Sequence, residues 1–478
     1  MGKRWVSAIA MAAVLAGCGG DGGGGSAGGV ATTTPTPTST TTAGTCSLRD
    51  RQDWAAAQLR EWYLFPETLP ASLDPTPYSS VDTYIDALTA TARSQRRDRF
   101  FTYLTSIKGE DAFYNAGASA GFGVRLSTDA AAGRVFISEA FEGAPALAAG
   151  IDRGTEIVAI GTNASDLRTV RSIIASEGTA GVTNALGPNT AGTTRLLQIT
   201  DAAGTRNVSV AKADYALTPV SSRYGAKIIT DNGRQYGYIN LRTFINTADA
   251  PLRQAFASFK AAGVTNVIID FRYNGGGLVS ISELIGDLLG ANRSTSDVLD
   301  YTTFRPEKSA ENETRFFQPK AESIAPTKLA FIGTGGTASA SELTINAQIP
   351  YLHANVGLIG TNTYGKPVGQ IALDRTQCDD RLRVIAFATQ NANRQGAYFD
   401  GLAGVVEASC QATDDYTKPL GDPQEASTRA ALNFLQGISC TRISSGEVGA
   451  QSVGAAAKRE LLIPARPDAA QRETPGLF

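Results

Sequence analysis

The segment 333–342, GTGGTASASE, places two serines, Ser339 and Ser341, after a glycine-rich turn. A serine presented at the start of a helix by such a turn is a typical nucleophile for acyl transfer, provided that a neighbouring base accepts its proton. The only histidine of the sequence is His353, in the segment IPYLHANVG between a predicted helix and a predicted strand. A lone histidine in such a loop more often faces solvent than acts in catalysis, so a serine enzyme here needs another base.

A lysine is the alternative base, because burial lowers the pKa of a lysine towards neutrality. Lys366 lies in the segment TNTYGKPVGQ, residues 361–370, directly after an apolar predicted strand, VGLIG. That position favours an ammonium group near the end of a sheet. Spacing alone, however, equally describes an ordinary surface lysine in a turn, and lysines are mostly exposed.

Composition excludes several function classes. The chain has 478 residues, 42% of them apolar and 18% charged, which is typical of a globular protein of two or three domains. The formal net charge is −2 and no long basic run is present, so nucleic acid is not an expected partner. The cysteines show no CxxC spacing, and we expect neither a metal site nor a cofactor.

The first residues predict an exported protein. Lys3 and Arg4 precede an apolar run, residues 5–15, that is too short to span a membrane as a mature helix. The run ends in LAGC, which resembles a bacterial lipobox with Cys18 as the lipidated residue. Residues 1–18 are therefore predicted to be a lipoprotein signal peptide. A plain secretory signal cleaved after a small residue is the alternative.

The segment that follows is predicted to be a tether. Residues 19–45 are rich in Gly, then in Thr and Pro, and cannot form a core. Gly19 rather than Asp follows Cys18, which by resemblance favours the outer membrane. We therefore expect a lipid-anchored protein of the bacterial cell envelope that faces the periplasm, with no spanning helix.

Four further cysteines, Cys46, Cys378, Cys410 and Cys440, allow three pairings. An even number in an exported protein indicates one or two disulfides. We favour Cys378 with Cys410 and Cys46 with Cys440, because the second pair would join the ends of the folded region.

Domain boundaries follow changes in pattern. Residues 46–117 contain segments with apolar residues at helical spacing and are predicted to be a helical N-terminal module. Residues 214–440 alternate strands with helices, which indicates an α/β core with parallel strand pairing. Residues 441–478 show little periodicity and are predicted to be a flexible tail with one apolar patch, ELLIPA.

Residues 118–213 are rich in predicted strands, and their order resembles that of a PDZ domain. The resemblance depends on the loop Gly121-Phe122-Gly123-Val124 and on APALAAGIDRGTEIVAI, which reads as a short helix, a turn and a strand. In such a loop, consecutive N–H groups bind the end of a peptide that adds a strand to the sheet edge. A small β-rich domain without a peptide role is the alternative.

Three motifs in order, IIDFRYNGGG, GTASASE and TYGKPVGQ, resemble those of the S41 family of carboxy-terminal processing peptidases. The match covers most of residues 50–435. The resemblance implies an α/β multidomain protein in which a PDZ domain precedes a ClpP/crotonase-like catalytic core. It also implies a Ser-Lys endopeptidase that needs no cofactor.

The resemblance assigns a role to individual residues. Ser339 is the implied nucleophile, Lys366 the general base, and Gln370 the side chain that orients the lysine. The oxyanion hole would use the amides of Ala340 and of Gly277, which we favour over Gly276. Asp270 and Arg272, before the glycine turn, are expected to support the loop.

One feature departs from the family pattern. Lys366 follows Ser339 by 27 positions and Ser341 by 25, and the shorter interval is the usual one in the family. We retain Ser339, because the motif register sets the geometry of the turn whereas a loop accepts an insertion at low cost. The segment IPYLHANVG is the predicted site of that insertion, and Ser341 is expected to hydrogen-bond within the first turn of the helix.

The predicted function is endopeptidase cleavage of exported proteins whose apolar C-terminal ends are captured by the PDZ-like domain. Its partners would be protein or peptide substrates with free C-termini, and the membrane through the lipid anchor. A catalytically silent binding lipoprotein on the same fold, or a hydrolase of small esters, is the alternative. The oligomeric state is left open.

Overall fold

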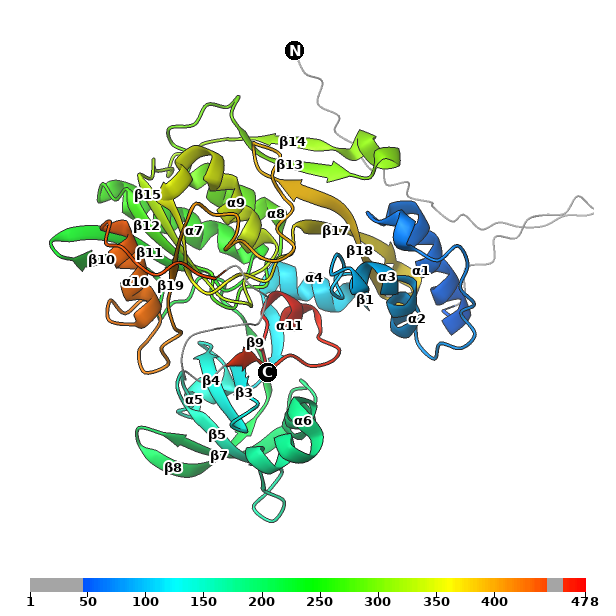
Figure 1. Cartoon of the computed structure of the whole chain (residues 1–478). Coiled ribbons are helices and arrows are strands. Elements are labelled where there is room, and N and C mark those ends of the chain that lie inside the picture. The colour runs from blue at the N-terminus through cyan, green and yellow to red at the C-terminus, as the bar shows by residue number, and fades with distance from the viewer. Residues whose placement is uncertain (1–45, 445–458) are drawn as a thin grey trace, which may run out of the picture. The chain divides into compact units, whose positions relative to one another are not determined.

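The structure, a computed structural model, describes residues 46–444 and 459–478 (Figure 1). The predicted signal peptide, the lipidation residue Cys18 and the tether lie outside the described residues. Within the described part of the chain, no helix has the length and apolar character needed to cross a membrane.

A six-stranded sheet forms the centre of the predicted catalytic region, in the order β10-β11-β12-β15-β16-β19. Strand β10 is antiparallel to β11, and every other neighbouring pair is parallel. The predicted α/β class with parallel pairing is therefore confirmed. The strands are β10 (Ala226–Asp231), β11 (Arg234–Asn240), β12 (Asn266–Asp270), β15 (Lys328–Gly333), β16 (Val356–Gly360) and β19 (Ala408–Gln411).

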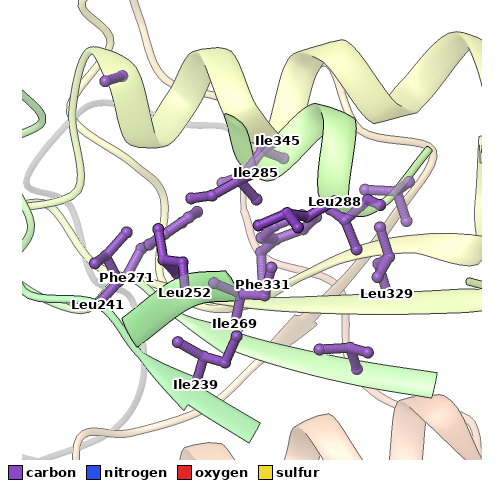
Figure 2. Close-up of a cluster of buried hydrophobic side chains, with 14 of the residues drawn as sticks. Ile239, Leu241, Leu252, Ile269, Phe271, Ile285, Leu288, Leu329, Phe331 and Ile345 are labelled. Carbon is purple, nitrogen blue, oxygen red and sulfur yellow. The ribbon is translucent and has the colours of Figure 1, made fainter. Parts of the chain in front are cut away.

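Helices cover both faces of this sheet because its buried strands are apolar on both sides. Ile269 belongs to a core formed with α7 (Asp249–Ala261), α8 (Val279–Leu288) and α9 (Ala340–Leu352). Its neighbour Ile268 belongs to a second core, formed with α10 (Ala426–Leu435). Figure 2 shows the first core, with Phe271, Ile285, Phe331 and Ile345 gathered between strands and helices.

A second, five-stranded sheet is built largely from the hairpin of β17 (Val368–Arg375) and β18 (Asp380–Gln390). Strand β18 also pairs antiparallel with β1 (Tyr103–Ser106) and with β13 (Val298–Phe304), which pairs in turn with β14 (Glu313–Phe316). The apolar residues of the N-terminal helices pack on this hairpin. The predicted N-terminal module therefore shares its core with β18. Its helices are α1 (Leu48–Trp62), α2 (Val81–Leu88), α3 (Ala90–Ser94) and α4 (Ile107–Ala116).

The predicted PDZ-like region forms a third sheet, with the path β20-β3-β4-β5-β7-β8. The short helix α5 (Pro145–Ala148) lies where the sequence predicts one, but the longer α6 (Val170–Leu186) was not expected. Helix α6 is interrupted at Gly178, whose backbone is not helical, and this interruption weakens its sequence pattern. The sheet contains β3 (Val124–Asp129), β4 (Arg134–Ala140), β5 (Glu156–Gly161), β7 (Thr194–Asp201) and β8 (Gly204–Ala211), and β6 (Arg168–Thr169) pairs with β5. Strands β2 (Ala118–Gly121) and β9 (Ala213–Ala216) form a separate two-stranded sheet.

The predicted flexible tail is wrong for residues 459–478. Strand β20 (Glu460–Leu461) pairs antiparallel with β3, and α11 (Ala469–Glu473) begins at a capping box formed by Asp468 and Gln471. The last residues, Leu477 and Phe478, are buried. Tertiary contacts order this segment although its sequence has little periodicity.

The disulfides are Cys46–Cys378 and Cys410–Cys440, so the favoured pairing is wrong. Cys378 lies in the turn between β17 and β18, where Arg51 of α1 forms an ion pair with Asp380 and brings the start of the chain close. The segment after α10 runs beside β19, with the amide of Gln411 donating to the carbonyl of Thr441. That contact brings together the two cysteines of the second pair.

Candidate active site

The three loops that carry the predicted chemistry follow the carboxyl ends of β12, β15 and β16, which are adjacent and parallel. Because the carboxyl ends of parallel strands meet at one edge of the sheet, these loops converge there. The glycine turn, the two serines and Lys366 therefore share one edge, although they span almost a hundred positions in the sequence.

Ser339 has the backbone of a nucleophile elbow. Its φ is 56° and its ψ is −117°, a region that non-glycine residues rarely adopt, and it immediately precedes α9. The side chain is half-buried. A Cβ placed on Gly276 would lie only 2.8 Å from the Ser339 Cβ, so the glycine turn packs directly against the elbow and requires a residue without a side chain.

Ser341 has different surroundings. It is fully buried, and its hydroxyl donates to the carbonyl of Asn274 at 3.2 Å. That bond joins α9 to the glycine loop, rather than satisfying a group within the first turn of the helix as expected. Ser341 therefore makes a structural hydrogen bond, and Ser339 is the serine with the strained backbone.

Lys366 is half-buried and held by Gln370, since its Nζ donates to the Gln370 Oε1 at 2.8 Å. The Gln370 Nε2 in turn donates to the carbonyl of Phe101, and the Lys366 ammonium lies 5.0 Å from the centre of the Phe101 ring. Among the described residues, Gln370 accepts the hydrogen bond of this ammonium and neither serine does. Hydrogen bonds between base and nucleophile often form only when substrate binds.

Burial lowers the pKa of Lys366 below its ordinary value of 10.5, because the charged form loses hydration. The negative charge of Glu473 opposes this shift, while the positive charges of Arg472 and Arg383 add to it. A lowered pKa increases the neutral fraction of the lysine, which is the form that accepts a proton.

Glu342 is a site residue to which the sequence analysis gave no role. Its fully buried carboxylate accepts the N–H of Ser339 at 3.0 Å, of Gly365 at 2.7 Å and of Lys366 at 2.7 Å. Burial raises the pKa of this carboxyl, and these hydrogen bonds oppose the rise. The side chain joins the serine elbow to the lysine turn. An acid three residues after a helix N-cap is the signal that predicts such a contact.

The predicted oxyanion amides have free N–H groups. No described residue accepts a hydrogen bond from the N–H of Gly277 or of Ala340. By contrast, the N–H of Gly276 donates to the Asn274 Oδ1 at 2.9 Å. Gly277 also lies beside Phe244, where a Cβ would be 2.3 Å from the carbonyl oxygen of that residue. Two free N–H groups flank the elbow, as an oxyanion requires.

The loop after β12 is supported by a buried charge network. Arg272 forms ion pairs with Asp270 at 2.7 Å and with Glu425 at 2.8 Å, and all three side chains are fully buried. Asp414 joins the network at 3.1 Å from Arg272 and 2.6 Å from Arg153 of the PDZ-like region. Buried charges are stable when each has a partner, so this network fixes the base of the glycine loop.

His353 is remote from this chemistry. Its side chain is 65% exposed and its Nδ1 lies 2.9 Å from the Glu407 Oε1. The predicted loop IPYLHANVG is mostly helical, because α9 continues to Leu352 and a 3₁₀ turn covers His353–Asn355. The segment predicted to hold the two surplus positions before Lys366 is therefore a helix end and a tight turn, and the place of the surplus stays a prediction.

A cleft of about 1650 Å³ opens beside the elbow. Its walls come from the catalytic sheet, from the N-terminal segment, from the PDZ-like strand β3 and from the C-terminal segment. Ala338 and Lys366 come from the catalytic region, Phe101 from the N-terminal segment, Ser127 from β3 and Glu473 from the C-terminal segment.

The predicted peptide-binding loop joins β2 to β3. Phe122 is buried within the PDZ-like core, and Gly121, Gly123 and Val124 are also buried. The N–H groups of Gly123 and Val124 both donate to the main-chain oxygen of Phe478. This loop therefore holds a chain segment in the structure.

Comparison with known proteins identifies the core. Residues 235–397 match the model of peptidase family S41, a range that contains Gly277, Ser339, Ala340, Lys366 and Gln370. A crystal structure from Bacteroides fragilis described as an S41 protease superposes with a TM-score of 0.62 at 22% identity, covering 81% of this chain and 97% of the other. That likeness shows a shared fold.

Two curated relatives are similar in sequence. The "C-terminal processing peptidase, chloroplastic" of Tetradesmus obliquus is 29% identical over 272 residues, 54% of each chain. "Carboxyl-terminal-processing peptidase 3, chloroplastic" of Arabidopsis thaliana is 26% identical over 362 residues, 73% of this chain and 65% of the relative. The chain thus spans between about half and two thirds of the length of these relatives. Residues 235–397 are thus the part of this chain that is similar to peptidase family S41.

Proposed function

We propose that this chain is a serine peptidase in which Ser339 attacks the scissile carbonyl and Lys366 is the general base. The observation that carries the proposal is the shared carboxylate of Glu342. It binds the amide of the strained Ser339 and the amide of Lys366, and so couples nucleophile and base at one edge of the sheet. The alternative of a binding protein without chemistry leaves this coupling unexplained.

In the first step, neutral Lys366 accepts the hydroxyl proton of Ser339 while the Ser339 oxygen forms a bond to the carbonyl carbon. Gln370 directs the amine, since it accepts the hydrogen bond of Nζ. Burial supports this step, because it lowers the pKa of Lys366 and thereby increases the fraction that can accept a proton.

The carbonyl oxygen becomes an oxyanion in the tetrahedral intermediate. The free N–H groups of Gly277 and Ala340 are the proposed donors, and fixed backbone dipoles stabilise such charge without reorganisation. When the intermediate collapses, the C–N bond breaks and protonated Lys366 returns the proton to the leaving amine.

The acyl-enzyme is then hydrolysed. Lys366 takes a proton from a water molecule, the hydroxide equivalent attacks the ester carbonyl, and Ser339 leaves with the proton returned by the lysine. The same pair thus serves both half-reactions, and the chemistry calls on no group beyond these side chains, the two amides and water.

We propose exported proteins with apolar C-terminal ends as the substrates. The relatives carry names that specify C-terminal processing, and the PDZ-like loop has N–H groups that bind a chain segment lying along the edge of β3. Strand addition of this kind gives affinity through the backbone and selectivity through side-chain pockets.

We further propose a lipid-anchored location in the bacterial envelope. Two disulfides agree with an oxidising compartment, and the segment before Cys18 is the basis for the anchor. Metabolic labelling with a fatty acid tests it: Cys18→Ser is expected to remove the label and to release the protein from membranes. A labelled Cys18→Ser protein contradicts the anchor.

The catalytic proposal is tested with Ser339→Ala, using Ser341→Ala as the matched control. Cleavage of a peptide with an apolar C-terminal end is expected to fall at least about 10⁴-fold for Ser339→Ala, because loss of a nucleophile leaves only binding and oxyanion contributions. Ser341→Ala removes a hydroxyl that contacts Asn274 and is expected to keep most activity. Reversal of the two results contradicts the assignment, and an inactive wild-type protein favours a binding role.

A further inference from the structure

The C-terminal residues of the sequence lie on the edge of β3 as an added strand. The main-chain oxygen of Phe478 accepts hydrogen bonds from the N–H of Gly123 at 2.9 Å and of Val124 at 3.2 Å. The Phe478 N–H donates to the Val124 carbonyl at 2.9 Å, and the Leu126 N–H donates to the Gly476 carbonyl at 2.8 Å. The pattern is antiparallel and continuous, which is the geometry of strand addition by a peptide.

The side chain of Phe478 fills an apolar pocket of the PDZ-like core. It is 2% exposed and belongs to the same cluster as Phe122 and Leu126. A Cβ on Gly121 would lie 2.7 Å from the Phe478 carbonyl carbon, so a glycine is required beside that residue. The groove therefore holds a bulky apolar side chain and, beside it, the main-chain oxygen of the same residue.

The same segment also crosses the catalytic edge. The N–H of Gly275, in the glycine loop, donates to the carbonyl of Glu473 at 3.0 Å. The Glu473 side chain accepts from the Tyr114 hydroxyl at 3.0 Å, and its charge acts on the pKa of Lys366. Arg472 stacks 3.6 Å from the centre of the Tyr103 ring. Residues 472–475 thus occupy space that borders the proposed base and oxyanion loop.

We propose that residues 459–478 are a built-in competitor, which fills the peptide groove and the adjoining substrate path until a substrate end displaces it. This inference rests on the proposed function and deepens it. It also specifies which substrates can displace the segment: those with an extended end that has a bulky apolar residue at the Phe478 position and a small residue at the Gly476 position. A Cβ on Gly476 would lie 2.9 Å from the Leu126 carbonyl oxygen, which excludes larger residues there.

A tethered competitor acts through mass action. Because the segment belongs to the same chain, its effective concentration is set by the connection and not by dilution, and such values reach the millimolar range. The apparent affinity for a peptide added in solution falls by the fraction of molecules whose groove is open. Unseating the segment is expected to restore the intrinsic affinity.

The experiment measures binding of a fluorescent peptide, ETPGLF, the sequence of residues 473–478, to the full chain carrying Ser339→Ala, which prevents cleavage. Phe478→Asp is added to unseat the segment, and Ala203→Asp serves as the matched control, because it places the same charge at an exposed position of the turn between β7 and β8, away from the groove. Phe478→Asp is expected to tighten peptide binding at least tenfold, with Ala203→Asp unchanged. A peptide in which Asp replaces the last Phe is expected not to bind.

A second variant guards against local unfolding. Deletion of residues 476–478 removes the strand without adding a charge, and is expected to give the same tightening as Phe478→Asp. No tightening in either variant overturns the proposal. Tightening that depends on protein concentration also overturns it, because the occupant would then come from a second copy of the chain.

Cleavage assays separate this proposal from the proposed function. With Ser339 intact, Phe478→Asp is expected to raise kcat/KM at least tenfold for a substrate ending in Leu-Phe. If no variant cleaves any peptide but binding tightens as described, the peptidase function fails and the competitor stands. If cleavage is robust but Phe478→Asp changes neither binding nor rate, the competitor fails and the peptidase function stands.

Discussion

Glu342→Gln tests whether one buried carboxylate holds nucleophile and base together. The carboxylate accepts three backbone N–H groups, two at Oε2 from Ser339 and Lys366 and one at Oε1 from Gly365. A glutamine of the same shape keeps only one acceptor oxygen, so its NH₂ group must face one of these donors. The variant loses at least one charge-assisted hydrogen bond, each contributing about 1.5–3 kcal/mol, and weakens the others.

The expected loss of hydrogen-bond free energy is about 3 kcal/mol. If all of it is lost from transition-state stabilisation, kcat/KM falls roughly 150-fold. The assay combines steady-state peptide cleavage with urea denaturation, so that catalysis and folding are measured on the same protein. Glu407→Gln, which changes the exposed carboxylate beside His353, is the matched control and is expected to act like wild type.

A kcat/KM within threefold of wild type for Glu342→Gln refutes this reasoning. It would mean that the carboxyl is already neutral in the folded protein, which is the direction in which burial shifts its pKa. A loss of stability without a loss of rate would likewise limit Glu342 to a structural role.

Four further predictions concern the same site and the fold that supports it. The pKa of Lys366 is lowered, so kcat/KM is expected to rise with pH and to level off below 10.5, and a flat profile contradicts a lysine base. The folded chain binds the proton of Lys366 less tightly than the unfolded chain does. The free energy of unfolding is therefore highest above the pKa that Lys366 has in the unfolded chain, and it decreases as the pH falls below that value. At pH 7 Lys366→Met is thus expected to be inactive but to melt at a higher temperature, measured by calorimetry. Gly276→Ala places a Cβ 2.8 Å from that of Ser339 and is expected to lower kcat/KM more than tenfold, whereas Gly335→Ala, with no atom within 4 Å of its Cβ, is expected to retain activity. Replacing Cys410 and Cys440 by Ser opens a loop with a sequence separation of 30 and is expected to lower the free energy of unfolding by about 3 kcal/mol in urea titrations; an unchanged midpoint contradicts that pairing.

The order of strands and helices in the core could be predicted because short apolar runs such as VIID and LAFIG alternate with segments of helical length, which is the pattern of a parallel sheet. The convergence of Ser339 and Lys366 then follows from the parallel order, since both residues come after carboxyl ends of neighbouring strands. The helical continuation to Leu352 was missed because Pro350 reads as a helix breaker, whereas near the end of α9 it is tolerated.

Contacts between distant segments could not be predicted. The pairing of Cys46 with Cys378 depends on α1 packing against the β17–β18 hairpin, which no local pattern encodes. The order of residues 459–478 likewise depends on an acceptor, the free edge of β3, that lies more than three hundred positions earlier. A periodic pattern of apolar residues predicts a helix or strand that buries one face. Residues 459–478 have almost no such pattern.

The pairing of β1 with β18 also sets the order of events when the chain is made. Tyr103 lies opposite Arg383 in that pair, and the carbonyl that holds Gln370 belongs to Phe101, 269 positions earlier. The early segment therefore stays unpaired until most of the chain has been synthesised, and contacts of such large sequence separation form slowly. The proposed base gains its support only when that last sheet closes. Under the proposed function, a newly made chain therefore lacks a working base during the period in which it is unfolded and other copies can cleave it.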